Sequence, residues 1–81
     1  MSPREQGFTK DNGEVVDVRY AEARVRKELQ AKWGFFFDRE TVREAARRIC
    51  NNPIHNGVLV SWLCRNAFDV ALEVRIEREG A

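Results

Sequence analysis

The segment from Phe37 to Pro53 constrains the fold of this chain most, because it carries signals for both ends of a helix. Asp38 is a favoured N-cap residue, and it gives Phe37 and Val42 the N′ and N4 positions of a hydrophobic staple. At the other end, Pro53 pushes the preceding residue out of helical geometry. The spacing predicts a helix from Arg39 to about Cys50 whose buried residues are Val42, Ala45, Ala46 and Ile49.

A second amphipathic stretch predicts a helix from about Asp17 to Trp33. Apolar residues recur there at helical spacing, at Val18, Ala21, Val25 and Leu29. Acidic residues precede basic ones by four positions, as in Glu22–Arg26 and Glu28–Lys32, which is the favoured order for helix ion pairs. Gly34 suits the C′ position after the helix.

Residues 15–20 also fit a strand. Val16, Val18 and Tyr20 would share one face, with Asp17 and Arg19 on the other. A short strand before the helix therefore stays open as an alternative.

Residues 58–78 are strongly apolar and fit two arrangements. One is a third helix to about residue 71, followed by an extended tail in which Leu72, Val74 and Ile76 alternate with charged residues. A helical tail would place Glu73 and Glu77 in like-charge repulsion. The rival is a hairpin of 58–64 and 70–78, turning at 65–69. We favour the helix followed by a strand-like tail.

The chain of 81 residues has room for one domain. Residues 1–13 are expected to be a flexible lead-in that ends at the turn signal Asp11-Asn12-Gly13, and residues 14–81 a single globular helical domain. The predicted fold class is mainly α, a small three-helix domain with short β segments near Val15–Tyr20 and in the C-terminal tail. The alternative is α+β with a C-terminal hairpin.

Composition limits the environment and the partners. Hydrophobic residues make up 43% of the chain and charged residues 33%, as in a folded domain. The net charge of +1 creates no long-range field, so binding to nucleic acid requires basic residues gathered on one face. The N-terminal residues lack the apolar core of a signal peptide, and the longest apolar run, 57–64, is far short of the ~20 residues that span a bilayer. Two cysteines are too few for a secreted disulfide framework, so a cytoplasmic location is expected, with both thiols buried.

The residues that usually carry chemistry form no motif. His55 is the only histidine and is expected in an exposed loop, without a neighbouring nucleophile in sequence. Cys50, His55 and Cys64 make three zinc ligands at most, whereas structural zinc sites use four. The glycines stand alone and form no phosphate-binding loop. The sequence therefore predicts no enzyme activity, no metal site and no cofactor.

Two features suggest a binding surface. Arg39, Arg43 and Arg47 recur every four residues and so line one edge of the predicted helix, and guanidinium groups suit carboxylate or phosphate partners. The run WGFFF before this helix contains more aromatic rings than one corner can bury, which leaves Phe35 and Phe36 as candidates for exposure. The predicted partner-binding residues are these five.

The leading hypothesis is a small non-enzymatic protein that regulates or inhibits a larger protein or complex by direct contact. Small, charge-rich domains of this size are common among the proteins of phages and mobile elements. On this association by size, we extend the hypothesis to a protein encoded by a phage or mobile element. The alternative is a small DNA-binding transcriptional regulator, dimeric, that uses the arginine-rich helix. A homodimer is compatible with both.

Overall fold

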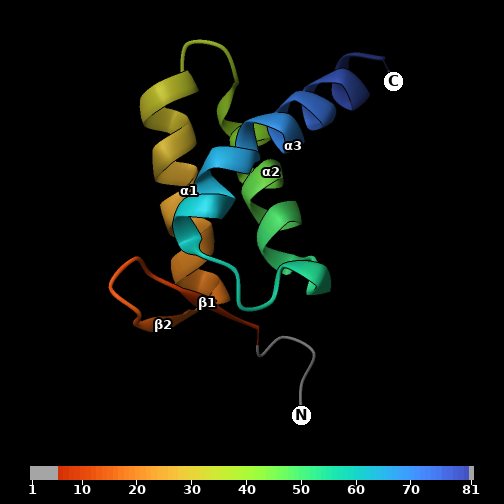
Figure 1. Ribbon diagram of the computed structural model, residues 1–81. Coiled ribbons are helices and arrows are strands. Elements are labelled where there is room, and N and C mark those ends of the chain that lie inside the picture. The colour runs from red at the N-terminus through yellow and green to blue at the C-terminus, as the bar shows by residue number, and fades with distance from the viewer. Residues whose placement is uncertain (1–5, 81) are drawn as a thin grey trace.

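The computed structural model describes residues 6–80, which form three packed helices and a two-stranded sheet. The helices are α1 (Val18–Trp33), α2 (Arg39–Asn51) and α3 (Val60–Gly80), and each packs against the other two (Figure 1). Strands β1 (Gly7–Thr9) and β2 (Val15–Asp17) pair antiparallel at one end, and a short 3-10 turn, η1 (Pro53–His55), precedes α3. The mainly α fold predicted from the sequence is confirmed.

Helix α2 has the boundaries that its sequence predicts. The Asp38 carboxylate accepts a hydrogen bond from the Thr41 amide at 2.9 Å, which caps the N-terminus. Phe37 and Val42, the two staple residues, are both buried. The helix ends at Asn51, immediately before the residue that precedes Pro53.

Helix α1 follows β2 without a break. Residues 15–17 therefore form the strand that the sequence allowed, and residues 18–20 begin the helix. Asp17 ends the strand and caps the helix, accepting a hydrogen bond from the Tyr20 amide. Gly34 does not take the left-handed C′ conformation that was expected, since its φ is −62°. A Cβ there would collide with the carbonyl oxygen of Gln30, so the close approach of this backbone atom explains the glycine instead.

The expected flexible lead-in over residues 1–13 is wrong from Gly7 onward. Gly7–Thr9 form β1, and Phe8 is completely buried. The strand is also tied to the loop before α3, because the Thr9 amide donates to the Val58 carbonyl at 3.0 Å. The predicted turn is present, with Gly13 at φ 90°. Residues 1–5 lie outside the described part of the chain.

Helix α3 continues to Gly80, so the extended tail and the rival hairpin are both wrong. Val74 is buried, so α3 stays packed against the other helices as far as that residue. Glu77 forms an ion pair with Arg48 of α2 at 2.8 Å, and this neutralises the repulsion from Glu73 that the sequence suggested. The C-terminal end of α3 extends past the bundle (Figure 1).

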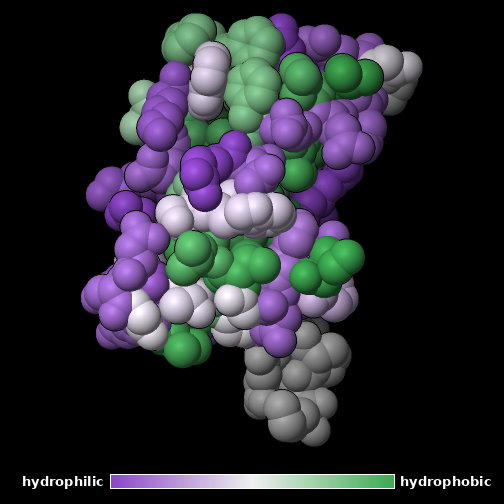
Figure 2. Space-filling model, in the orientation of Figure 1, coloured by the Kyte–Doolittle hydropathy of each residue, from purple (hydrophilic) through white to green (hydrophobic). Residues whose placement is uncertain are grey.

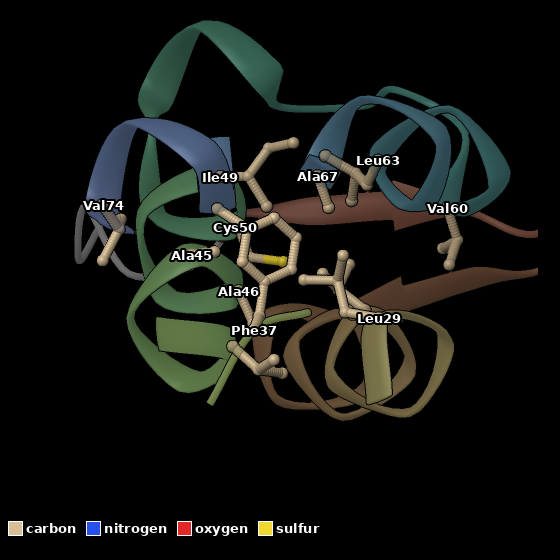
Figure 3. Packing of buried hydrophobic residues seen from close by; sticks show 14 of the residues in the cluster. Leu29, Phe37, Ala45, Ala46, Ile49, Cys50, Val60, Leu63, Ala67 and Val74 are labelled. Atoms are coloured by element: carbon tan, nitrogen blue, oxygen red, sulfur yellow. The ribbon is translucent and has the colours of Figure 1, made fainter. Parts of the chain in front are cut away.

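The core lies between the three helices and is closed at one end by the hairpin (Figure 3). Its buried residues are small or aliphatic except for two rings: Phe8, Ala21, Val25, Leu29, Phe37, Val42, Ala45, Ala46, Ile49, Cys50, Val60, Leu63, Ala67, Ala71 and Val74. None of the helices in residues 6–80 combines the length and the apolar character that crossing a bilayer requires.

Candidate functional site

The corner between α1 and α2 presents aromatic rings to solvent. Phe35 is 84% exposed and Phe36 is 40% exposed, whereas the next residue, Phe37, turns into the core. Figure 2 shows apolar side chains gathered at the top of the molecule, where this corner lies in Figure 1. We call Trp33, Phe35, Phe36 and Phe68 the aromatic corner. Phe68 comes from α3 and is not among the residues predicted from the sequence to form a binding surface.

The rings beneath Phe35 pack closely on one another. Trp33 lies 4.6 Å from Phe68, and Phe36 lies 4.8 Å from Phe37, measured between ring centroids. These separations are typical of favourable aromatic pairs. The nearest ring to Phe35 is Trp33, at 5.8 Å. Phe35 therefore stands on an ordered aromatic base while most of its own surface meets water.

Arg75 of α3 fixes the position of the corner. Its guanidinium donates a hydrogen bond to the Phe36 carbonyl at 3.1 Å, and its central carbon lies 4.3 Å from the centroid of the Phe36 ring. Glu79 accepts from the same side chain at 3.1 Å and holds it in place. This combination of a hydrogen bond and a cation–π contact ties the corner to the last turns of α3.

A groove of about 510 Å³ runs between α1 and α2 and is lined by four cations. We call it the basic groove; its charged residues are Arg26 and Lys27 from α1 and Arg39 and Arg43 from α2. Within residues 6–80, no carboxylate lies within 4.0 Å of any of them. Gln30 also lines the groove near the C-terminal end of α1, so the groove runs toward the aromatic corner.

The other arginines of α2 are paired within the chain. Arg47 donates to Glu44 at 2.8 Å, and Arg48 bridges Glu44 and Glu77 at 2.9 and 2.8 Å. Hydrogen bonds from these arginines lower the pKa of the Glu44 carboxyl. Arg47 therefore lies outside the basic groove and already has a partner.

The five residues predicted as one surface are thus arranged in three places. Phe35 and Phe36 form the corner, Arg39 and Arg43 line the basic groove, and Arg47 is bound to Glu44 on the outer side of α2. Only the tertiary packing adds Arg26 and Lys27 to the groove, because they lie on a different helix from Arg39 and Arg43.

A second groove, lined by the hairpin turn, α1 and the start of α3, is largely neutralised internally. Lys10 pairs with Glu14, and Arg24 and Lys32 both approach Glu28. This second groove differs from the basic groove because most of its cations have carboxylate partners in the chain.

The residues weighed as chemical groups are placed as follows. Cys50 is buried, and burial raises the pKa of its thiol to about 12, whereas Cys64 is half-buried. His55 is partly buried, and its Nδ1 lies 2.8 Å from the Ile49 carbonyl oxygen. Among residues 6–80, no three histidine, cysteine or acidic side chains are grouped to hold a metal ion.

Comparison with known proteins found no family model, no curated protein and no solved structure that matches this chain.

Proposed function

We propose that this chain is a small non-enzymatic binding protein that regulates or inhibits a larger protein by docking its aromatic corner and basic groove. The observation that carries the proposal is the 84% exposure of Phe35. A phenyl ring in that position gains little from folding, yet its surroundings are ordered by packed rings and by Arg75. A preorganised aromatic side chain loses little entropy on binding, and such residues dominate the energy of protein interfaces.

The cations next to the corner support a protein partner. Arg39 and Arg43 carry planar guanidinium groups that pair with carboxylates through two hydrogen bonds. Arginine and aromatic residues are the two classes most enriched in the centre of protein interfaces. The proposed mode of action follows from this chemistry: the chain covers a surface of its partner and changes what that surface can do. We propose that it acts in the cytoplasm, where Cys50 and Cys64 stay as free thiols.

The charge distribution on α2 favours protein over nucleic acid as the partner. Glu40 and Glu44 lie on the same exposed side of the helix as Arg47. A helix inserted into a DNA groove would bring these carboxylates close to phosphates, which repel them. Arg47 and Arg48 are also engaged by the chain's own carboxylates, so they contribute less to phosphate binding.

Affinity capture from the native host tests the proposal. Tagged wild-type protein, Phe35→Ala and Ile54→Ala are compared by mass spectrometry, with and without nuclease. Ile54 is a matched control because it is 78% exposed and lies beyond the opposite end of α2, about 20 Å from the corner by helix rise. We expect that wild type and Ile54→Ala retain a partner protein and that nuclease treatment does not change this recovery. Phe35→Ala should no longer retain that partner. Equal recovery by all three proteins, or recovery that nuclease abolishes, would contradict the proposal.

A further inference from the structure

We infer that the basic groove receives a short carboxylate-rich segment of the partner protein, an inference that rests on the proposed function. The groove places two cations of α1 opposite two cations of α2. Four like charges so arranged repel one another, and the described residues supply no carboxylate within ion-pair distance to offset this. A bound anionic segment would supply the missing charges.

Within residues 6–80, the cations without an ion pair gather mainly in the groove, which holds four of the six, the others being Arg19 and Arg65. On α1, Arg24 and Lys32 form ion pairs with Glu28, and on α2, Arg47 forms an ion pair with Glu44. The sequence places Glu22 four residues before Arg26, where a helix pair is expected.

That expected pair is not formed. The Glu22 carboxylate accepts a hydrogen bond from the Asn51 side chain at 2.8 Å instead, and no ion pair joins it to Arg26. Arg26 is thereby left available to an external anion, together with its neighbours in the groove.

The dimensions of the groove suit a short segment. Along α1 it extends from Ala23 to Gln30, which is about 10 Å at the helical rise of 1.5 Å per residue. That length accommodates about three residues of extended chain or two turns of helix. A nucleic acid backbone would continue beyond the groove and meet the exposed carboxylate of Glu40 on α2, so a peptide is the better match.

The aromatic corner adds a requirement for an apolar side chain. The corner joins the two helices that form the groove, and Phe35 precedes Arg39, the first residue of α2, by four positions. A segment that leaves the groove at this end therefore reaches the connection between the two helices, which carries Phe35. We infer that the bound segment combines several carboxylates with an aliphatic or aromatic residue at one end.

The test is an NMR titration of the full chain with a synthetic peptide of four glutamates flanked by leucines. The matched probe replaces the glutamates by glutamines, and a single-stranded oligo-dT provides phosphate charge; both are compared at about 50 mM salt. We expect the glutamate peptide to shift the amide signals of Arg26, Lys27, Arg39 and Arg43, while the glutamine peptide does not. Arg43→Glu should weaken binding at least fivefold. Arg65→Glu, the same charge change at another exposed arginine, should leave the affinity within twofold.

Three results would overturn the inference: unchanged affinity of Arg43→Glu, shifts confined to other parts of the surface, or tighter binding of oligo-dT than of the glutamate peptide. The capture experiment stays independent of this one. A partner that depends on Phe35 but not on Arg43 would retain the proposed function and reject the acidic segment. If the glutamate peptide binds the groove but no partner depends on Phe35, the preference of the groove for carboxylates is kept and the proposed function is rejected.

Discussion

Phe8 and Phe35 allow one substitution to be tested in two opposite environments. Phe8 is completely buried in β1, whereas Phe35 is 84% exposed at the aromatic corner. Replacing a buried phenylalanine by alanine costs about 3–5 kcal/mol, which includes the cavity that is left behind. Phe35 removes only about a sixth of its surface from water, so the same substitution there costs about 0.5 kcal/mol, from a full burial worth about 3 kcal/mol.

Urea unfolding followed by tryptophan fluorescence measures both values. A domain of this size has a total stability of roughly 4–12 kcal/mol, so Phe8→Ala should remove about a quarter of it or more, or unfold the protein outright. Phe35→Ala should shift the urea midpoint by less than about 0.5 M. A loss above about 1.5 kcal/mol for Phe35→Ala would mean that this ring is covered in solution, and the proposed docking surface would not be free. A loss below about 1 kcal/mol for Phe8→Ala would contradict the packing of the β1–β2 hairpin against the core.

Three further predictions concern stability and reactivity. Hydrogen bonds from Arg48 lower the pKa of Glu77, so the stability from this pair is present at neutral pH and is lost as the pH falls below about 4.5; Glu77→Gln should flatten the decline of the urea midpoint on acidification. The thiol of Cys50, whose pKa is raised to about 12, should not react with a disulfide reagent at neutral pH until the protein unfolds, whereas the half-buried Cys64 should react slowly; fast labelling of both would contradict the packing. A chain ending after Leu72 should lose more helical circular dichroism than the deleted residues carry and melt at a lower temperature, while an unchanged melting temperature would show that the last turns of α3 contribute nothing.

The parts of the fold that the sequence predicted are those with local signals. Helix α2 has a cap at Asp38 and a stop before Pro53, and both depend only on neighbouring residues. The first helix was equally well marked by its apolar stripe. Residues 15–20 satisfied both a strand and a helix pattern because the chain changes from one to the other at Asp17.

The errors came from interactions that only tertiary structure creates. A single buried ring, Phe8, sits among polar residues, and no periodic pattern distinguishes it from a lead-in. The tail of α3 alternates like a strand, but Val74 packs on the bundle and Arg48 neutralises Glu77. Local like-charge repulsion of a few tenths of a kcal/mol is small beside those contributions.

The candidate site could be predicted from the sequence only in part. The run of rings at the corner indicated exposure, and Phe35 is exposed. The spacing of the α2 arginines placed them on one edge, but it could not show that Arg47 bonds Glu44 or that Arg26 and Lys27 complete a groove. Those relations depend on how α1 lies against α2.

The most direct test of the central claim is calorimetric titration of the captured partner with wild-type protein, Phe35→Ala and Ile54→Ala. An interface anchor costs about 2 kcal/mol or more when truncated, which corresponds to roughly a thirtyfold loss of affinity. We predict a loss of that size for Phe35→Ala, with Ile54→Ala within twofold of wild type. An affinity of Phe35→Ala equal to that of wild type would contradict docking through the aromatic corner.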